Sequence, residues 1–237
     1  MSYFSNATVI HDFSLDKEEY VYIHSIMDIF NEIDFISEVY VCGGFMRDYF
    51  MGKPVSKDID IFINCSRAKM KNFVELLGQY GKVVYGQYES PRFFPDDFKE
   101  LYVDIVPFYN FIVPKESIND IESLLSNFDI TANAIGYEIK SKTLFNPVRG
   151  IEDIRDGILR AVRLDFPEKP VSEEISLSAV SVFWFRLLHY QYKLGFRFSP
   201  ETERWILENK WRYQDLDAFK QYFFEPLISE RMNKLLK

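Results

Sequence analysis

The feature that most constrains the fold is a strand that ends in two glycines and is followed, after a short helix, by an acidic strand. Residues 38–42 (EVYVC) favour a strand that runs into Gly43-Gly44. A short helix is expected from Phe45 and is broken at Gly52-Lys53-Pro54. Residues 58–64 (DIDIFIN) then alternate polar and apolar side chains, as in a strand with one polar face. This order of elements predicts a mixed α/β layer.

The apolar periodicity of the rest of the chain indicates a mixed part followed by a helical part. Helical spacing is expected over 16–35, 67–77, 117–126 and 150–155, strands over 82–85 and 101–108 with a polar connection at 89–98, and a hairpin-like return over 133–139 and 143–145. From about residue 173 only helices are expected, over 173–194, 200–209, 213–224 and 227–237. The predicted fold class is α+β: a mixed-sheet domain over 1–165 and an all-helical domain over 166–237, with the boundary near Pro167–Pro170.

Composition indicates a globular chain without a membrane segment. Hydrophobic residues make up 47% and charged residues 27%, and no apolar run reaches about 18 residues, so a cytoplasmic location is expected. Cys42 and Cys65 are expected to be buried thiols, and three histidines without a Cys/His cluster argue against a zinc site. The many aromatic residues fit an aromatic core first, with stacking of bases on exposed rings as the alternative.

The charge is distributed unevenly along the chain. The formal net charge of −8 argues against a protein that coats nucleic acid without specificity. Residues 181–237 carry ten basic and seven acidic side chains, a net of +3, and residues 1–180 carry 18 and 29, a net of −11. An acidic first part and a mildly basic second part fit a metal site followed by a surface that faces a polyanion, although solvated charged faces give the same pattern.

The two glycines are placed to approach phosphate. A strand that ends in Gly43-Gly44 before a helix leaves backbone N–H groups free to bind an anion near the positive end of that helix. Glycine is required there because a Cβ atom would block the approach. Paired glycines also occur in ordinary turns, so they gain meaning only with the acidic strand that follows.

Asp58 and Asp60 are the strongest candidates for catalysis. Side chains at i and i+2 of a strand point to the same face, so the two carboxylates project together. Adjacent carboxylates repel and stay ionised together when a cation lies between them. Their hard oxygen atoms suit Mg²⁺ or Mn²⁺, which shares phosphate oxygens of a nucleotide. An exposed polar strand face is the alternative interpretation.

Asp104 is the candidate third carboxylate. It lies within the apolar segment Tyr102-Val103-Asp104-Ile105-Val106, where a lone aspartate is unfavourable unless it is paired or bound to metal. If this strand lies beside the acidic strand, three carboxylates could hold two metal ions. One ion would activate the acceptor hydroxyl and the other the triphosphate leaving group.

Taken in order, these motifs resemble the head domain of class II tRNA CCA-adding enzymes and bacterial poly(A) polymerases. The head signature is matched by Gly43-Gly44-Phe45-Met46-Arg47-Asp48 followed by Asp58-Ile59-Asp60, and Asp129-Ile130-Thr131-Ala132-Asn133-Ala134 is similar to the family's Asp-Phe-Thr-Ile-Asn-Ala motif. Residues 146–153 and 158–162 resemble the stretch that closes the head, and 194–202 with 228–231 resemble neck helices. The resemblance implies a nucleotidyltransferase head followed by a helical neck.

The resemblance also implies roles for single residues. Gly43 and Gly44 would face the triphosphate, and Asp58, Asp60 and Asp104 would bind the metal ions. Asp129 and Asn133 would lie near the ribose of the nucleotide, and Arg160 could neutralise phosphate. Arg47 would either bind the nucleotide or form an ion pair that shapes the turn. The implied reaction is metal-dependent transfer of a nucleoside monophosphate from a nucleoside triphosphate onto an RNA 3′ end, with tRNA or a tRNA-like acceptor favoured.

The sequence departs from the family pattern in the neck. The Glu-Asp-x-x-Arg motif that selects C and A in the family falls on Ala179, Val180 and Phe183, which offer no side-chain hydrogen bond. The two arginines expected before Asp129 are replaced by Asn127 and Phe128. We therefore expect relaxed or altered base choice and no true CCA synthesis.

The resemblance ends near the end of the neck, so acceptor binding is expected from basic residues of the C-terminal helices, from a homo-oligomer or from a partner protein. The candidates named for this role are Arg186, Lys193, Arg197, Arg204, Lys210, Arg212, Arg231, Lys234 and Lys237. Two other functions stay open. The same chemistry could modify a protein or a small molecule, as in a toxin, or the chain could be a catalytically silent nucleotide- or RNA-binding module.

Overall fold

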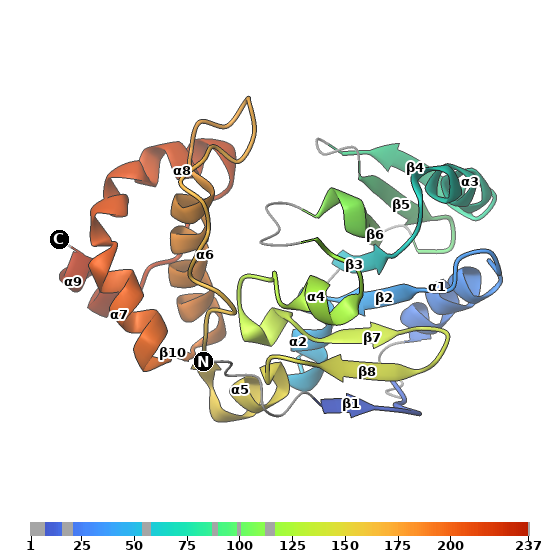
Figure 1. Ribbon diagram of the computed structural model, residues 1–237, viewed down its shortest axis with the longest axis horizontal. Helices are drawn as coiled ribbons and strands as arrows, with labels where there is room; N and C mark the ends of the chain where they lie inside the picture. Colours follow the sequence, from blue (N-terminus) through green and yellow to red (C-terminus); the bar gives the residue numbers. More distant parts are fainter. Residues whose placement is uncertain are drawn as a thin grey trace.

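The computed structural model describes residues 8–15, 21–53, 58–86, 90–98, 101–111 and 117–236. These residues form an eight-stranded mixed sheet followed by a group of helices (Figure 1). The sheet order is β1-β8-β7-β2-β3-β6-β5-β4, with the strands Thr8–Ile10 (β1), Val39–Cys42 (β2), Asp58–Ile63 (β3), Gly81–Tyr85 (β4), Pro91–Pro95 (β5), Tyr102–Pro107 (β6), Gly136–Glu138 (β7) and Thr143–Asn146 (β8). The predicted α+β class is confirmed.

Strand β3 lies at the centre of the sheet and carries the acidic residues. It pairs antiparallel with β2 and parallel with β6, in a register that puts Asp60 opposite both Cys42 and Asp104. Strand β5 pairs antiparallel with β6 and puts Arg92 opposite Asp104. Directly opposed residues share one face of a sheet, so Asp60, Asp104 and Arg92 form a row across three strands.

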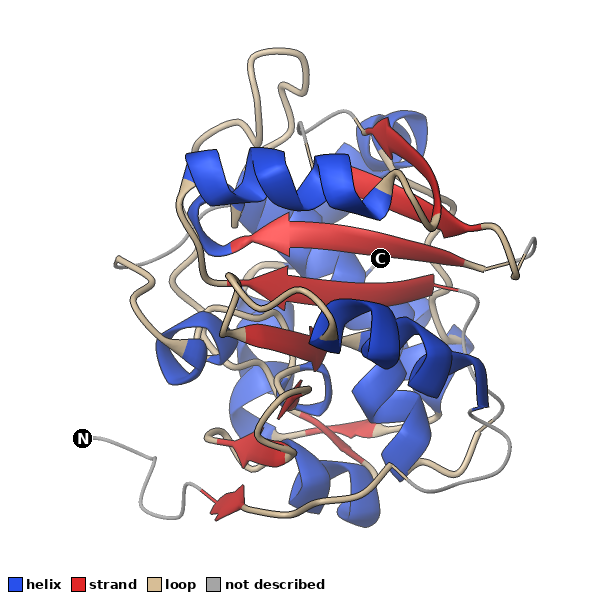
Figure 2. Ribbon diagram, turned by 90° about the vertical axis from the view of Figure 1, so that its right-hand side faces the viewer, coloured by secondary structure: helices blue, strands red, loops and turns tan. Residues whose placement is uncertain are grey.

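Helices α1 (Val21–Asn31) and α3 (Arg67–Leu77) cover one face of the sheet (Figure 2). Their buried side chains pack on the apolar alternate residues of β2, β3 and β6, and the rings of Phe30 and Phe73 lie 5.3 Å apart. The side chain of Ser66 accepts a hydrogen bond from the Lys69 N–H, so α3 begins at a capped end. Because this face is filled with apolar side chains, the carboxylates of β3 are directed to the opposite face.

The opposite face of the sheet is covered in part by helix α4 (Ile121–Leu125). Asp120 and Ser123 form a reciprocal capping box, so the helix begins at Ile121 and does not include residues 117–120. Leu124 and Phe128 pack on Tyr40 and Phe62 in a second apolar cluster. Helices α2 (Gly44–Phe50) and α5 (Gly150–Asp156) complete the mixed part of the chain.

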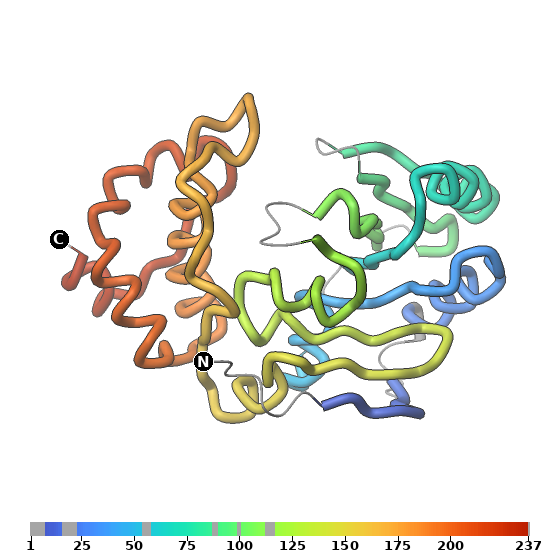
Figure 3. The backbone as a smooth tube through the Cα atoms, viewed as in Figure 1, coloured from blue at the N-terminus to red at the C-terminus, as the bar shows by residue number. Residues whose placement is uncertain are grey.

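The C-terminal part is built around helix α6 (Ala179–Leu194), which α7 (Pro200–Glu208), α8 (Leu216–Tyr222) and α9 (Glu230–Leu236) surround (Figure 3). Trp184 and Phe185 are fully buried, and the indole N–H of Trp184 donates to the Ile206 carbonyl at 3.1 Å. A buried ring of this size contributes about 3–5 kcal/mol against truncation to alanine. We call this helical part, residues 179–236, the neck, and the mixed part before it the head.

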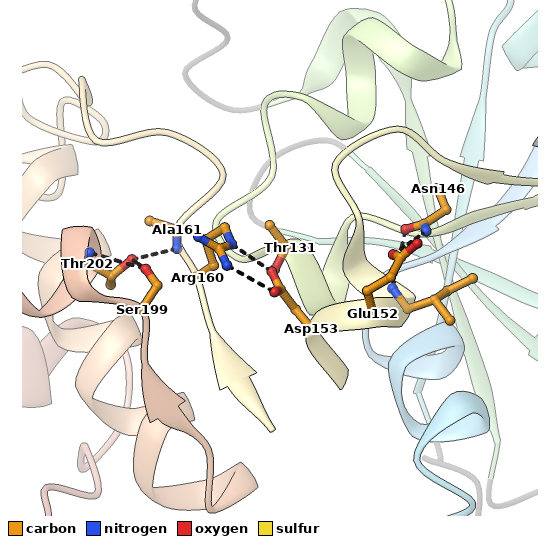
Figure 4. A network of polar contacts seen from close by, with 9 residues as sticks. Thr131, Asn146, Glu152, Asp153, Arg160, Ala161, Ser199 and Thr202 are labelled. Atoms are coloured by element: carbon orange, nitrogen blue, oxygen red, sulfur yellow. Dashed lines mark hydrogen bonds and ion pairs between the residues drawn. The ribbon is translucent and has the colours of Figure 1, made fainter. Parts of the chain in front are cut away.

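A short seam joins head and neck. Strand β9 (Ile158–Leu159) pairs in parallel with β10 (Arg197–Phe198), and the Ala161 N–H donates to Thr202 Oγ1 at 3.0 Å (Figure 4). Ser199 caps α7 and donates to the same Thr202 hydroxyl at 2.8 Å. These contacts fix the neck against the last turn of the head.

Several expected elements differ from the observed ones. Strands β1 and β5 were not expected, because β5 has prolines at both ends and reads as a connection. The helix expected over 173–194 begins at Ala179, where Ser178 caps it, and 213–224 is divided into a 3₁₀ segment, Lys210–Asp215, and α8. The expectation that no strand follows residue 173 is wrong, since β10 pairs with β9.

The remaining observations concern the cysteines and the possibility of a membrane-spanning helix. Cys42 and Cys65 are free thiols, but only Cys42 is buried as expected, whereas Cys65 is half-buried. No helix in the described part of the chain has the length and apolar character that a membrane crossing requires. Of the predicted elements, residues 16–20 and residue 237 fall outside the described residues.

Candidate active site

A cavity of about 460 Å³ lies between the carboxylate-bearing face of the head and helix α6 of the neck. Its walls are lined by Gly43, Gly44, Arg47, Asp58, Asp60, Phe62, Phe111, Asn127, Phe128, Asp129, Asn133, Phe166, Val171, Ala179, Val182, Phe183, Arg186, Tyr190, Lys193 and Phe223. Seven of the nine site residues predicted from the sequence are among them. Asp104 and Arg160 are the two that are not.

Gly43 brings the end of β2 against Asp60. Its φ of +74° belongs to the left-handed region that favours glycine, and a Cβ atom there would lie 2.9 Å from Asp60 Oδ2. The glycine therefore allows the backbone and the carboxylate to share one corner of the cavity. The sequence predicted that glycine is needed here for an approach to phosphate, and the structure shows a second reason, the closeness of Asp60.

Asp58 and Asp60 project from β3 toward this corner. Asp58 is exposed, whereas Asp60 is half-buried. Burial, together with the negative charges of Asp104 and Asp58, raises the pKa of Asp60 to about 6, and Arg186 and Arg47 only partly oppose this. At neutral pH, where Asp60 is mostly ionised, the neighbouring carboxylates repel its charge. A bound cation would relieve this repulsion.

Asp104 lies beside the pair but is engaged elsewhere. Arg92 on β5 donates from Nε to Asp104 Oδ1 at 2.6 Å and from Nη2 to Oδ2 at 2.9 Å. The guanidinium also stacks over the ring of Tyr102, 4.3 Å from its centroid. Both carboxylate oxygens of Asp104 thus face an arginine.

The donor set fits one divalent cation better than two. Asp58 and Asp60 offer adjacent carboxylates at the mouth of the glycine turn, which suits an ion that also binds phosphate. Within the described residues, no group of three or more His, Cys, Asp or Glu side chains is arranged to hold a metal ion. The expected three-carboxylate set is therefore not assembled here, because Arg92 occupies Asp104.

A polar chain crosses the cavity from head to neck. Arg47 is buried, pairs with Asp48 at 2.8 Å and donates to Asn133 Oδ1 at 2.8 Å. Asn133 in turn donates to Asp129 Oδ1 at 3.0 Å, and Arg186 on α6 donates to Asp129 Oδ2. The ion pair proposed as one alternative for Arg47 is thus present, and the same side chain lines the cavity.

Asp129 has its acceptor positions filled. Oδ1 accepts from Asn133 and from the Ile130 N–H at 2.8 Å, and Oδ2 accepts from Arg186 Nε at 3.0 Å and Nη2 at 2.5 Å. A carboxylate has about four lone-pair sites. Burial alone would raise the pKa of Asp129, but the charge and hydrogen bonds of Arg186 outweigh it and lower that pKa.

The neck side of the cavity is apolar along the first turns of α6, before the charged side chains of Arg186 and Lys193. Ala179, Val182 and Phe183 line it from α6, and the rings of Phe183 and Phe166 lie 4.3 Å apart. Phe128 joins this surface from the head. Asn127 also lines the cavity, but its amide donates to the Ser123 carbonyl and its oxygen accepts from Arg163. Two of the three positions of the base-selecting motif, Ala179 and Phe183, therefore present hydrocarbon and aromatic surface to the cavity, and the third, Val180, is buried outside its lining.

Arg160 is turned away from the cavity. It pairs through Nε with Oδ2 of the fully buried Asp153 at 2.9 Å, and Thr131 donates to the same oxygen at 2.7 Å (Figure 4). The expected phosphate role of Arg160 is corrected by this placement, because the buried carboxylate already satisfies the guanidinium. Arg160 holds the end of the head together.

Three residues of the site were missed or misplaced by sequence reasoning. Arg92 lies in a strand that was expected to be a connection, so its register with Asp104 gave no signal. Arg186 was grouped with the RNA-binding arginines, but it points into the head. Tyr190, four residues later on α6, has a ring that lies beneath both Arg47 and Arg186.

Comparison with known proteins agrees with this geometry. The family described as "Poly A polymerase head domain" matches residues 39–160, which is just over half of the chain. The chain belongs to this family.

Curated relatives of the head-domain family were found with low identity. A multifunctional CCA protein of Nitrosococcus oceani is 26% identical over 174 residues, which are 70% of this chain and 37% of that protein. A CCA-adding enzyme of Geobacillus stearothermophilus is 28% identical over 183 residues, 73% of this chain and 40% of that enzyme. The chain thus spans well under half the length of these relatives.

Solved structures share the fold of the chain. A CCA-adding enzyme in complex with CTP aligns with a TM-score of 0.64 and 21% identity over 85% of this chain and 47% of its own. A Thermotoga maritima CCA-adding enzyme complexed with tRNA aligns with a TM-score of 0.64 and 20% identity over 92% of this chain and 51% of its own. The alignment includes the neck as well as the head, so both parts have the arrangement of this fold.

Proposed function

We propose that the chain transfers a nucleoside monophosphate from a nucleoside triphosphate to an RNA 3′ end, with tRNA or a tRNA-like RNA as the favoured acceptor. The observation that carries the proposal is the pair Asp58 and Asp60 next to the Gly43 turn, at one end of a cavity of nucleotide size. Membership of the head-domain family supports the class of reaction.

Each part of the cavity has a role in this reaction. Asp58 and Asp60 would hold a divalent cation, Mg²⁺ or Mn²⁺, which when bound supplies charge stabilisation at the reacting phosphoryl group. The N–H groups after Gly43 approach the triphosphate at the start of α2. Arg47 and Arg186 place two positive charges on the walls beside it. The fixed contacts of both arginines mean that this charge needs little reorganisation when the nucleotide binds.

We propose that base choice is relaxed. Ala179 and Phe183 line the part of the cavity where a matched polar motif would read the base. An apolar surface separates similar ligands by only about 10–200-fold, whereas matched hydrogen bonds separate them by about 10⁴-fold or more. We therefore do not assign ordered synthesis of a CCA end to this chain.

The acceptor assignment is supported by relatives and by charge. Proteins similar to this chain are named for CCA addition, and one structure is a complex with tRNA. On the neck, Lys193, Arg197, Arg204, Lys210 and Lys234 are exposed. Their charges would attract a phosphate backbone without reading its sequence. We expect such an acceptor in the cytoplasm.

The test is a labelling experiment with four separate nucleotides. The chain is incubated with each α-³²P-labelled nucleoside triphosphate, Mg²⁺ and total cellular RNA, and D58A/D60A serves as the inactive control. Label in RNA of tRNA size that is absent with the control supports the proposal. Label in protein or a small molecule would instead support the toxin-like alternative, and no label under any condition would support a binding module.

A second acceptor separates relaxed transfer from CCA synthesis. tRNA that lacks its 3′ tail is supplied with all four nucleoside triphosphates together, and the product is sequenced. Addition with several different bases supports relaxed choice. A product that ends uniformly in CCA would overturn this part of the proposal.

A further inference from the structure

The row of carboxylates across the sheet ends at a positively charged side chain, that of Arg92. Asp60, Asp104 and Arg92 are directly opposed on β3, β6 and β5, so they share one face. Tyr102, two residues before Asp104, lies on that face opposite Asp58. The three carboxylates of Asp58, Asp60 and Asp104 and the guanidinium of Arg92 therefore lie at neighbouring positions on one face of three adjacent strands.

Arg92 is held by two groups of this face. It donates two parallel hydrogen bonds to Asp104, the geometry in which an arginine binds a carboxylate most strongly. Its guanidinium stacks on Tyr102 at 4.3 Å. Tyr102 is hydrogen-bonded to Asp58, so the arginine is connected to Asp58 of the acidic strand through Tyr102.

We propose that Arg92 withholds Asp104 from metal binding, so that the chain binds a single divalent cation through Asp58 and Asp60. The guanidinium takes the position that a second ion would need in order to use Asp104. This inference rests on the proposed function, because it assigns the metal requirement of the same site.

Charge balance agrees with a single ion. Asp58, Asp60 and Asp104 carry three negative charges when ionised, and Arg92 reduces the sum to two, which one divalent cation balances. A second ion at Asp104 would have to break a bidentate pair and release the guanidinium from Tyr102. Mg²⁺ gives up its water only reluctantly, so it competes poorly for a carboxylate whose two oxygens are both occupied.

A merely structural arginine would behave differently. The side chains of Arg92 and Asp104 are 42% and 29% exposed, and an ion pair at that exposure can be an ordinary surface contact. In that case metal binding would not change when Arg92 is replaced. Counting bound ions therefore separates the two roles.

The experiment is a Mn²⁺ titration of the full chain without nucleotide, with free Mn²⁺ measured by electron paramagnetic resonance. We expect one bound Mn²⁺ in the wild type and two in R92Q, which removes the charge and keeps a shorter polar side chain. R92K, which keeps the charge, is expected to bind one. R92Q/D104N is expected to return to one, because the released carboxylate is then absent.

The matched control is R155Q, which removes the charge of an exposed Arg155–Asp156 pair outside the cavity. It should bind one Mn²⁺ like the wild type. Circular dichroism melting of each variant verifies that the chain is folded. Two Mn²⁺ ions in the wild type, or one in folded R92Q, would overturn the inference.

The count of ions does not depend on turnover, so its failure is distinguishable from failure of the proposed function. If the wild type binds one Mn²⁺ ion and R92Q binds two, but no RNA is labelled, the inference on Arg92 stands and the proposed function fails. If RNA is labelled but wild type and R92Q both bind two ions, the reverse holds.

Discussion

Arg186 of the neck donates two hydrogen bonds to a single oxygen of Asp129 in the head, at 3.0 and 2.5 Å. The two residues are 57 positions apart, and the side chain of Asp129 is only 12% exposed. The contact lies in the cavity wall, so the same pair that joins the two parts of the chain also shapes the nucleotide site.

Replacing Arg186 should therefore destabilise the whole chain. R186Q leaves an enclosed carboxylate without its cation, which costs about 3–5 kcal/mol for a fully buried pair. Because Arg186 itself is 35% exposed, we expect about 1–3 kcal/mol in urea unfolding at pH 7. R155Q, in an exposed pair, should change the free energy of unfolding by less than about 0.5 kcal/mol. Equal effects of the two substitutions would contradict a bridging role for Arg186.

The destabilisation by R186Q should depend on pH. In the wild type the pKa of Asp129 is lowered below its ordinary value of about 3.9, burial being outweighed by Arg186. A lowered pKa in the folded state stabilises the fold above the unfolded pKa, and this contribution is lost as pH falls through the folded pKa. In R186Q burial without the arginine raises the pKa of the same carboxyl, so the difference between wild type and R186Q should be largest near pH 7 and shrink steadily as pH falls toward about 4. Urea midpoints across this range measure it, and a difference that grows in acid would refute the assignment.

The Gly43 turn can be tested separately from backbone strain. Gly43 and Gly157 have φ of +74° and +63°, but only at Gly43 would a Cβ meet the Asp60 carboxylate, whereas nothing lies within 4 Å at Gly157. G43A and G157A should each lose about 1 kcal/mol of stability. Only G43A should lose nucleotide transfer, by about 100-fold or more, because Asp60 must move. If both variants keep full activity in the labelling assay, the turn is not part of the active site.

Much of the site was predictable because its signal is local. The period of two over β3 placed Asp58 and Asp60 on one face, and Gly43-Gly44 predicted the turn between β2 and α2, although its contact with Asp60 was not predicted. The arginines that pair with the carboxylates were not predictable. Arg92 contacts Asp104 from a neighbouring strand, and Arg186 contacts Asp129 from the neck. The periodicity of a single segment carries no information on which distant side chain will face it.

Divalent cations should stabilise the chain through Asp60. Burial, together with the charges of Asp104 and Asp58, raises the pKa of Asp60 to about 6. Ionisation of Asp60 above this pH therefore opposes folding. The chain should become more stable as pH falls from above 6 toward the pKa of an aspartate in the unfolded chain, about 3.9. In a metal-free buffer at pH 7.5, D60N should melt at a higher temperature than the wild type. Adding Mg²⁺ should raise the melting temperature of the wild type and leave D60N unchanged. A wild type insensitive to Mg²⁺ at millimolar concentration would count against the site.

Discrimination between ribose and deoxyribose is expected to be weak. A site with a free acceptor for the 2′-hydroxyl loses that hydrogen bond with a deoxynucleotide and can reject it by about 10⁴-fold. Asp129, the expected ribose partner, already accepts four hydrogen bonds, so a 2′-hydroxyl has to displace one of them. We expect kcat/KM for ATP to exceed that for dATP by no more than about tenfold, the range of a single exchanged hydrogen bond. R186Q, which frees Oδ2, should increase the ratio, and steady-state kinetics with the two nucleotides measure it. A wild-type ratio of about a thousand would mean that another group reads the sugar.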